Sequence, residues 1–369
     1  MQQRSASFDV IKGIAILLVI LGHVFRLSLR GAPSVLEDVI YTIHMPMFVL
    51  VTGYFSTRPI EWTMSGVWSF WKAKVLRLLL PLLFIAEIVQ IANEGAVSLP
   101  LRSMVDRYWF TYALFMIFVV FFSVQGCCRL VSKLCLLIRP SEDQERMVRW
   151  IRLVLFIVSV PVIELGISYL YGINPRMCNG LVLYKVAHLY KYLLLGYFLG
   201  EYPRFERGVQ SEVAGAVGFF CFIVLFTAQR LGLGFPGQEV LLTFSGLVFV
   251  YSAVHHSVTE QSKALYWVQG FAYLGRISLA VYFLHYFFLP DLSFARVYEM
   301  SLSDDPLALF AFQGLLALLV TSIILVPTLL LARITRCNRY LRFSSMERLS
   351  PSVHSCSSTS CRLLGTISS

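Results

Sequence analysis

The stretch FDVIKGIAILLVILGH, Phe8 to His23, followed by IYTIHMPMFVLVTGYF, Ile40 to Phe55, decides how this chain folds. Each run is long enough to cross the apolar core of a bilayer as a helix, and each contains a histidine. Asp9 and Lys12 stand at the start of the first run. Ionisable groups inside a membrane are costly and usually functional. These polar residues, with His44 in the second run, are therefore the first candidates for a site.

The rest of the chain repeats this apolar pattern. Of 369 residues, 57% are hydrophobic and only 14% are charged, against about 25% charged in an average soluble domain. We expect about ten transmembrane helices, at 11–29, 39–57, 75–93, 108–124, 152–171, 184–200, 212–231, 238–256, 271–290 and 306–332. The sequence thus predicts an all-α integral membrane protein with one transmembrane domain over residues 1–332.

Charge predicts the orientation of these helices. An even number of spans puts both termini on one side, and most of the 31 lysines and arginines then fall in cytoplasmic segments if the termini are inside. The net charge of +10 follows this membrane topology and gives no basic domain, so we do not expect nucleic acid as a partner. Residues 333–369 are basic, then serine-rich, and predict a disordered cytoplasmic tail. The eight cysteines show no metal-ligand spacing, so we expect no metal site.

The first helix carries a polar stripe. Lys12 and His23 are eleven residues apart, about 1100° at 100° per residue, which is about 20° past three turns. Asp9 lies about 40° to the other side of Lys12. His23 would lie roughly 16 Å above Lys12 in an apolar core about 30 Å thick. The stripe therefore runs from an Asp/Lys pair at the cytoplasmic entrance to a histidine past the middle of the membrane.

Other histidines are predicted at a similar depth. His44, His188 and His285 all fall in the outer part of their helices. Lys191 lies slightly deeper, within reach of Glu87 or Glu164, and such a pair can be purely structural. A single histidine near a helix end is more often an interfacial or hydrogen-bonded core residue. The convergence of several in one layer favours a site.

Five sequence motifs, in order, cover most of the chain. They are Lys12 and His23 within DVIKGIAILLVILGH, HMPMFVLVTGYF (His44 to Phe55), KAKVLRLLLP (Lys72 to Pro81), WFTYALF (Trp109 to Phe115) and LGRISLAVYFLHYFF (Leu274 to Phe288). With these motifs the chain resembles the membrane-bound acyltransferase-3 family, in particular its fucose 4-O-acetylase-like branch. The family often has arginine where Lys12 stands, and lysine keeps the charge but loses the planar guanidinium fork.

The resemblance implies an O-acyltransferase of the plasma (cytoplasmic or inner) membrane, with no bound cofactor. Its donor would be cytoplasmic acyl-CoA, with acetyl favoured, and its acceptor a sugar hydroxyl on a lipid-linked, cell-surface or exported glycan. His23 is then the expected general base, because imidazole titrates near neutral pH. An acyl-histidine intermediate is the covalent alternative, and His44 is expected to orient His23 or polarise the carbonyl.

The remaining candidates serve binding of the two substrates. Lys72, Lys74 and Arg77 can hold CoA phosphates by charge-assisted hydrogen bonds, or can simply follow the positive-inside bias. Asp9 and Lys12 can position the pantetheine arm, or form a simple ion pair at a helix start. Trp109 can stack on a sugar or belong to an interfacial aromatic belt. Tyr282 and His285, three residues apart, are weaker candidates because such pairs are common in packing.

A different class of protein also fits the buried histidines. A transporter or flippase for a glycan or small solute can use them as a proton relay. Transporters commonly show inverted repeats and helices broken by glycine or proline in paired positions. No such pairing is visible in this sequence, which favours the enzyme.

Overall fold

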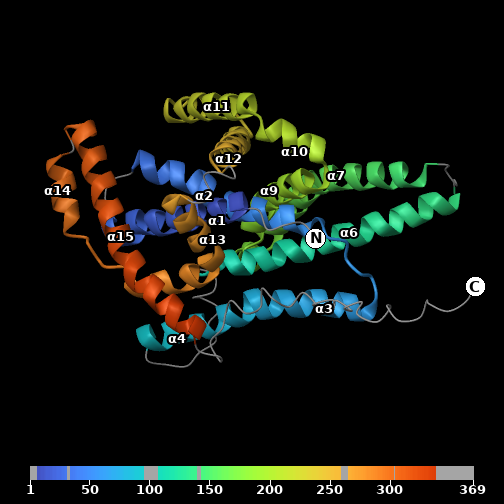
Figure 1. Ribbon diagram of the computed structural model, residues 1–369, viewed down its shortest axis with the longest axis horizontal. Coiled ribbons are helices and arrows are strands. Elements are labelled where there is room, and N and C mark those ends of the chain that lie inside the picture. Colours follow the sequence, from blue (N-terminus) through green and yellow to red (C-terminus); the bar gives the residue numbers. More distant parts are fainter. Residues whose placement is uncertain are drawn as a thin grey trace, which may run out of the picture.

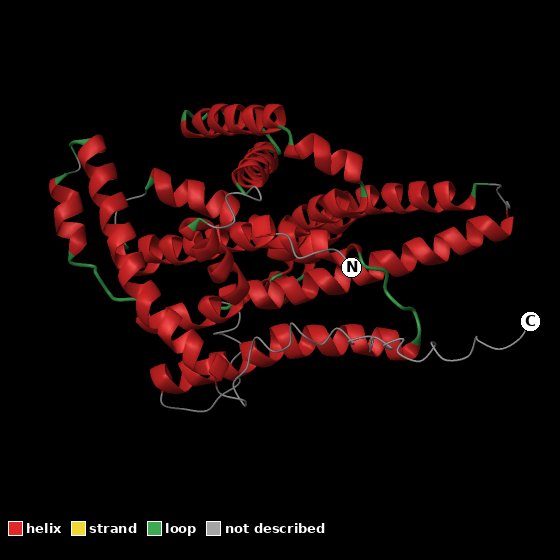
Figure 2. Ribbon diagram, viewed as in Figure 1, coloured by secondary structure: helices red, strands yellow, loops and turns green. Residues whose placement is uncertain are grey.

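The computed structural model describes residues 6–30, 34–94, 107–138, 143–258, 265–302 and 304–337. Nearly all of these residues are helical and none forms a β-strand (Figures 1 and 2). The elements are α1 (Ala6–His23), η1 (Val24–Leu29), α2 (Val35–Tyr54), η2 (Phe55–Thr57), α3 (Met64–Lys74), η3 (Val75–Leu79), α4 (Leu80–Glu94), α6 (Trp109–Ile138), α7 (Gln144–Ile173), α8 (Pro175–Gly180), α9 (Leu183–Glu201), α10 (Pro203–Gln210), α11 (Glu212–Arg230), α12 (Gln238–Ser257), α13 (Tyr266–Leu284), η5 (His285–Phe288), α14 (Ala295–Ser301) and α15 (Pro306–Cys337).

The structure confirms an all-α, multi-pass membrane protein. Within the described ranges, eight helices are long and apolar enough to cross a bilayer. The other two predicted spans, 75–93 and 184–200, are also helical, as the continuous run from α3 through η3 to α4 and as α9. Helix α15 continues past residue 332 to Cys337, and residues 338–369 of the predicted tail lie outside the described part of the chain.

Helices α1 and α13 pack with their backbones in contact. A Cβ atom at Gly13 would overlap the carbonyl of Phe271, and one at Gly275 would overlap the carbonyl of Asp9. Lipid tails are as apolar as leucine, so close packing at small residues holds membrane helices together where the hydrophobic effect does not. This contact sets the position of α1 relative to the end of α13.

Helices α2 and α9 also pack with their backbones in contact at glycines. Gly53 lies against the carbonyl of Leu193, and Gly196 lies against the carbonyl of Leu50. Helix α1 is the most enclosed of the candidate spans, whereas α7 and α11 turn most of their residues outward. The two glycine-mediated pairs therefore form the centre of the molecule, with the other helices around them (Figure 1).

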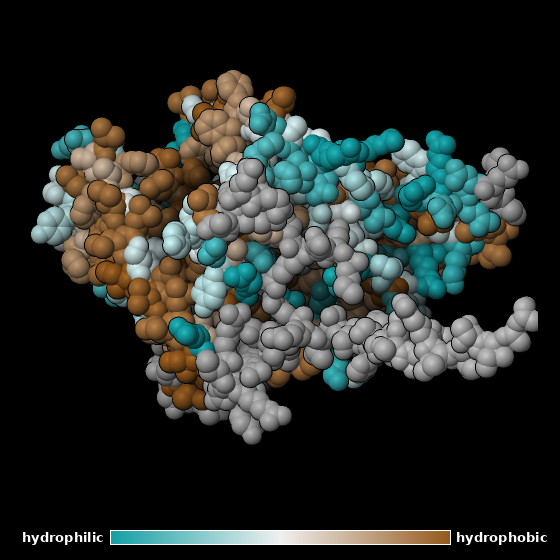
Figure 3. All heavy atoms as spheres, viewed as in Figure 1, coloured by the Kyte–Doolittle hydropathy of each residue, from teal (hydrophilic) through white to brown (hydrophobic). Residues whose placement is uncertain are grey.

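Two helices extend beyond the others at one end. Helices α6 and α7 have 30 residues each, about 45 Å of helix against an apolar core of about 30 Å. In Figure 1 the end of α6 and the start of α7 project together at the right. Figure 3 shows hydrophilic residues gathered over this end and hydrophobic residues over the opposite part, around α15. In the orientation predicted from charge, the projecting end is cytoplasmic.

Candidate active site

The structure joins His23 to His285 by a hydrogen bond. His23 is the last residue of α1, where the helix widens into the π-helical turn η1, and His285 begins the 3₁₀ turn η5 after α13. The His23 Nδ1 and His285 Nε2 atoms are 2.8 Å apart, and the two rings are parallel to within 2°. Both residues are buried. Wider π turns inside α-helices frequently mark functional sites, and here one follows the candidate base.

Two further contacts fix this pair. His285 Nδ1 lies 3.0 Å from the Val281 carbonyl. The Tyr286 hydroxyl lies 3.1 Å from His23 Nε2 and 2.9 Å from the Arg107 carbonyl. We call the set of His23, His285 and Tyr286 the histidine relay.

The relay assigns one tautomer to each ring. A carbonyl only accepts, so Nδ1 of His285 carries the hydrogen and its Nε2, in the neutral ring, accepts. His23 must then donate from Nδ1, which leaves the lone pair on His23 Nε2. The basic nitrogen of His23 is therefore the one that faces the Tyr286 hydroxyl.

The Tyr286 hydroxyl suits either protonation state of His23. It has one hydrogen, which it donates to His23 Nε2 when that nitrogen is unprotonated. When Nε2 carries a proton, the hydroxyl can donate to the Arg107 carbonyl instead and accept from His23. The arrangement can therefore accept a proton on His23 and keep both ring nitrogens hydrogen-bonded.

His44 stands beside the relay without joining it. Its Nδ1 lies 2.6 Å from the Ile40 carbonyl, one turn back in α2. Its ring makes an edge contact with Tyr41, at 5.0 Å between centroids, and the Tyr41 hydroxyl lies 3.4 Å from the Gly22 carbonyl. His285 thus holds His23 directly, whereas His44 reaches that part of α1 through Tyr41.

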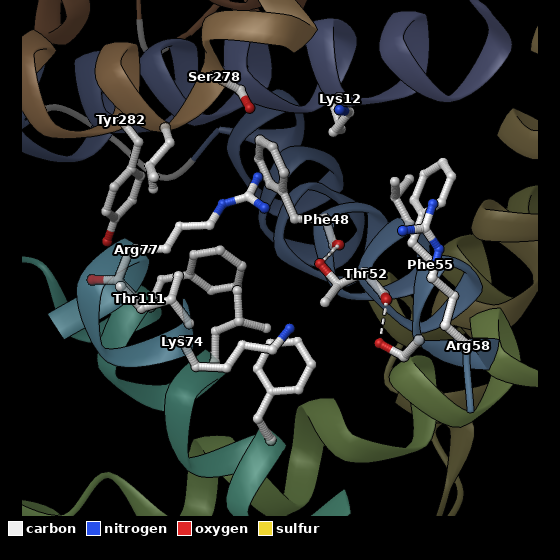
Figure 4. Close-up of a pocket in the computed structure, with 17 residues that line it drawn as sticks. Lys12, Phe48, Thr52, Phe55, Arg58, Lys74, Arg77, Thr111, Ser278 and Tyr282 are labelled. Atoms are coloured by element: carbon white, nitrogen blue, oxygen red, sulfur yellow. Dashed lines mark hydrogen bonds between the residues drawn. The ribbon is translucent and has the colours of Figure 1, made fainter. Parts of the chain in front are cut away.

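A basic cavity lies close to the relay, on the side of Tyr282, and we call it the donor cavity. Its volume is about 440 Å³. Figure 4 shows Lys12, Arg58, Lys74 and Arg77 converging on it from three elements, α1, the segment after η2, and the α3–η3 helix. Lys74 Nζ also sits 3.5 Å from the centroid of the Phe118 ring. A cavity with four cations can hold an anionic ligand by charge-assisted hydrogen bonds.

Tyr282 connects the donor cavity to the relay. It lines the end of the cavity away from Lys12 and Arg58 (Figure 4). Its ring centroid is 6.2 Å from that of His285. The cavity therefore extends from Lys12 and Arg58 to the neighbourhood of the two histidines.

Of the other predicted site residues, some line the donor cavity and some do not. Asp9 pairs with Lys12 at 2.9 Å, and only Lys12 lines the cavity. Lys72 is exposed and does not line it. Trp109 lies elsewhere, with Lys185 Nζ 4.0 Å from its ring centroid. Arg58 was not among the predicted site residues, because a single arginine after an apolar run reads as ordinary membrane flanking.

Two predicted polar residues of the membrane layer are not part of the relay. Lys191 of α9 pairs with Glu164 of α7 at 2.7 Å, the structural alternative considered for it. His188 lines a separate polar cavity of about 490 Å³ at the start of α2, the end of α11 and the start of α12, which is the outer side in the orientation predicted from charge. Asp38 and Arg230 form an ion pair of 2.7 Å at this cavity, and Glu239 and Tyr41 also line it. We call it the outer cavity.

The sequence of this chain is similar to those of known proteins. The sequence model of a family described as an acyltransferase domain matches residues 5–334. Two curated relatives, both called nodulation protein NolL, come from Mesorhizobium japonicum and Sinorhizobium fredii and are each 33% identical to this chain over 135 residues.

The matched stretch covers 32% of this chain and 35% and 36% of the two relatives, so the chain spans about a third of their length. No solved structure matches significantly. The family match, by contrast, covers the histidine relay, the donor cavity and the candidate spans up to residue 334. The chain therefore belongs to the acyltransferase-3 family and is a membrane-bound acyltransferase.

Proposed function

We propose that this protein transfers an acyl group, with acetyl favoured, from cytoplasmic acyl-CoA to a sugar hydroxyl of a cell-surface or exported glycan. The observation that carries the proposal is the histidine relay at the end of a basic cavity. Family membership supports an acyltransferase over the transporter considered from the sequence. The plasma membrane is the proposed location, because the donor is cytoplasmic and the acceptor is exported.

The donor enters from the side of Lys12 and Arg58. Lys12, Arg58, Lys74 and Arg77 attract the anionic acyl-CoA molecule toward the donor cavity. The thin pantetheine arm then extends along the cavity, past Thr111 and Ser278, so that the thioester reaches Tyr282 beside the relay. The cations that attract the donor thus lie apart from the residues that carry out the acyl transfer.

The acceptor enters from the opposite side. The outer cavity contains Asp38, Arg230 and Glu239, and carboxylate and guanidinium groups suit the hydroxyls of a sugar as acceptors and donors. Tyr41 lines this cavity and also contacts His44 and the Gly22 carbonyl, next to His23. An acceptor hydroxyl that reaches His23 replaces the Tyr286 hydroxyl at Nε2.

The proposed chemistry is general-base acyl transfer. His23 Nε2 takes the proton of the acceptor hydroxyl while its oxygen attacks the thioester carbonyl. The carbon–sulfur bond then breaks, and the CoA thiolate leaves with the proton returned from His23. His285 accepts the Nδ1–H bond of His23 throughout and stabilises the imidazolium that forms.

Replacing the base tests this proposal. We expect His23→Ala to lower acyl transfer by about 10²- to 10⁴-fold, the usual contribution of general acid–base catalysis. The control is His255→Ala, because His255 is exposed at the far end of α12. The measurement is mass spectrometry of the host's surface glycan, with the amount of protein in the membrane determined in parallel. Full acylation by His23→Ala would overturn the role of His23.

A further inference from the structure

A second cationic cavity lies on the projecting cytoplasmic end of the molecule. Its volume is about 590 Å³. It is walled by the second half of α6, the start of α7, the end of α9 and the segment after η2. We call it the cytoplasmic cavity, and nothing in the transfer chemistry described above uses it.

Cations outnumber anions in this cavity. Arg58, Arg129, Lys133 and Arg152 line it, and Glu201 is the one carboxylate among the residues that line it. Arg152 is committed to Glu201 at 3.0 Å and also donates to the Tyr197 hydroxyl at 3.3 Å. Among the described residues no ion pair involves the other three cations. The cavity therefore carries an excess of positive charge that a polyanion can neutralise.

The cations lie in a row. Gln125, Arg129 and Lys133 follow one another at intervals of four on α6, so their side chains share one face of the helix. A positive-inside bias alone requires basic residues near this end, but it requires neither a shared face nor an enclosing cavity. Arg129 and Lys133 on one face of α6, together with Arg58 from the segment after η2, suit a ligand with several phosphate groups.

An aromatic ring stands beside this row. Trp62 lines the cavity, and the Arg129 guanidinium lies 5.5 Å from its ring centroid. The Trp62 ring also packs against the ring of Phe122, with 4.8 Å between their centroids. Held aromatic rings next to cations provide stacking surfaces for nucleobases.

The cytoplasmic cavity adjoins the donor cavity. Arg58 lines both of them, and Thr57 and Ser56, its neighbours in the chain, line one each. A ligand with an anionic, aromatic head and a thin tail can occupy both cavities at once, with Arg58 at the passage between them.

We propose that the cytoplasmic cavity binds the 3′-phosphorylated adenosine diphosphate part of acyl-CoA. Arg129 and Lys133 bind its phosphates, Trp62 stacks on the adenine, and the pantetheine arm passes Arg58 into the donor cavity. This proposal rests on acyl-CoA being the donor, as proposed above. It adds a nucleotide subsite some distance from the transfer chemistry.

Direct binding tests the subsite without any turnover. The probe is adenosine 3′,5′-bisphosphate, titrated calorimetrically into the purified, full-length protein in detergent. We expect saturable binding that weakens at least tenfold in the double variant Arg129→Gln/Lys133→Gln and stays within twofold in Arg146→Gln. Arg146 is an exposed arginine near the start of α7 that lines neither cavity. Equal binding by the double variant and the wild type would overturn the subsite.

Kinetics with a shortened donor supply the second readout. S-acetylpantetheine lacks the nucleotide, so the double variant should use it as well as the wild type does. With acetyl-CoA, the same variant should show a KM raised about tenfold and an unchanged kcat. Normal turnover of the short donor also shows that the variant is folded.

The outcomes separate this inference from the proposed function. An unchanged KM for acetyl-CoA in a working enzyme removes the subsite and leaves the function in place. Specific binding of the bisphosphate by a protein that transfers no acyl group removes the function and keeps the subsite. Binding of phosphatidylglycerol vesicles that requires Arg129 and Lys133, with no binding of the bisphosphate, identifies a lipid headgroup site and overturns the proposal.

Trp62 provides a variant that leaves the charges intact. We expect Trp62→Leu to weaken binding of the bisphosphate at least threefold and Trp62→Phe to retain it, because phenylalanine keeps a stacking face. Inorganic phosphate should compete equally with the bisphosphate in both variants. Equal affinity of all three proteins for the bisphosphate would remove the stacking role of Trp62.

Discussion

His285 determines which nitrogen of His23 is basic. With the Val281 carbonyl at its Nδ1, His285 can only accept from His23, so the lone pair of His23 stays on Nε2. Without this partner the His23 ring can flip or change tautomer, and its base then points away from the acceptor. In the proposed mechanism His285 is therefore a positioning residue that acts through His23.

Removal of His285 should affect the rate and not the binding of the donor. We expect His285→Ala to lower kcat by about 10- to 100-fold, less than loss of the base itself, with the KM for acetyl-CoA unchanged. His285→Gln should recover much of the rate, since an amide can accept from His23 and donate to Val281. Steady-state kinetics in membranes measure both. Equal loss in the alanine and glutamine variants would contradict the orienting role.

Helix α1 and helix α13 bring the two histidines together through their glycine contact. Gly275, at the middle of α13, touches the Asp9 backbone, and Gly13, in the half of α1 away from the relay, touches the Phe271 backbone. Backbone atoms cannot move aside as a flexible side chain can. A methyl group at this contact must therefore push the helices apart.

We expect Gly275→Ala to lower the free energy of unfolding by about 1–3 kcal/mol, the usual cost of overpacking. Activity should fall as well, because the His23–His285 distance depends on the same contact. The control is Gly270→Ala on the same helix, where a Cβ meets nothing within 4 Å, and a better helix former is then neutral or stabilising. Thermal unfolding in detergent compares the two. Similar stability of both variants would show that the helices tolerate separation.

On the scale of the whole molecule, the site requires a fixed orientation in the membrane. Lys12, Arg58 and Lys74 line the donor cavity, and the outer cavity lies toward the other ends of the helices. The proposed reaction works only if the first of these faces the cytoplasm, where acyl-CoA is present. The distribution of basic residues favours that arrangement.

Reporter fusions in a bacterial host check the orientation. Alkaline phosphatase, which is active only outside the cytoplasm, should be active when fused after Gly234, between α11 and α12, and inactive after Gly208 in α10. Green fluorescent protein should give the opposite pattern. The reversed result would place the cationic cavities outside and remove the access of acyl-CoA to them.

The sequence predicted the individual helices and much of α1. Apolar runs gave the spans because only continuous helices satisfy the backbone within lipid. The spacing of Lys12 and His23 placed them on one helix face, and the structure shows Lys12 at the donor cavity and His23 in the relay. The Asp9–Lys12 ion pair, three residues apart, was also among the readings of the sequence. All of these features depend on contacts within one helix.

The contacts between helices could not be predicted from the sequence. His44 was expected next to His23, yet the hydrogen bond goes to His285. Lys191 had two possible carboxylates, and the packing of α7 on α9 selects Glu164. Arg58 was not predicted as a site residue, because only the tertiary structure shows that it lines both cavities.

What the sequence by itself determined is therefore the set of membrane helices, the family and the candidate base. The tertiary structure alone decided which histidine orients that base, where the donor cavity ends, and which cations share a cavity. The physical reason is that lipid and helix surfaces are equally apolar, so hydropathy does not say which helices meet. Close backbone packing at Gly13 and Gly275 makes that choice, and it puts His23 beside His285.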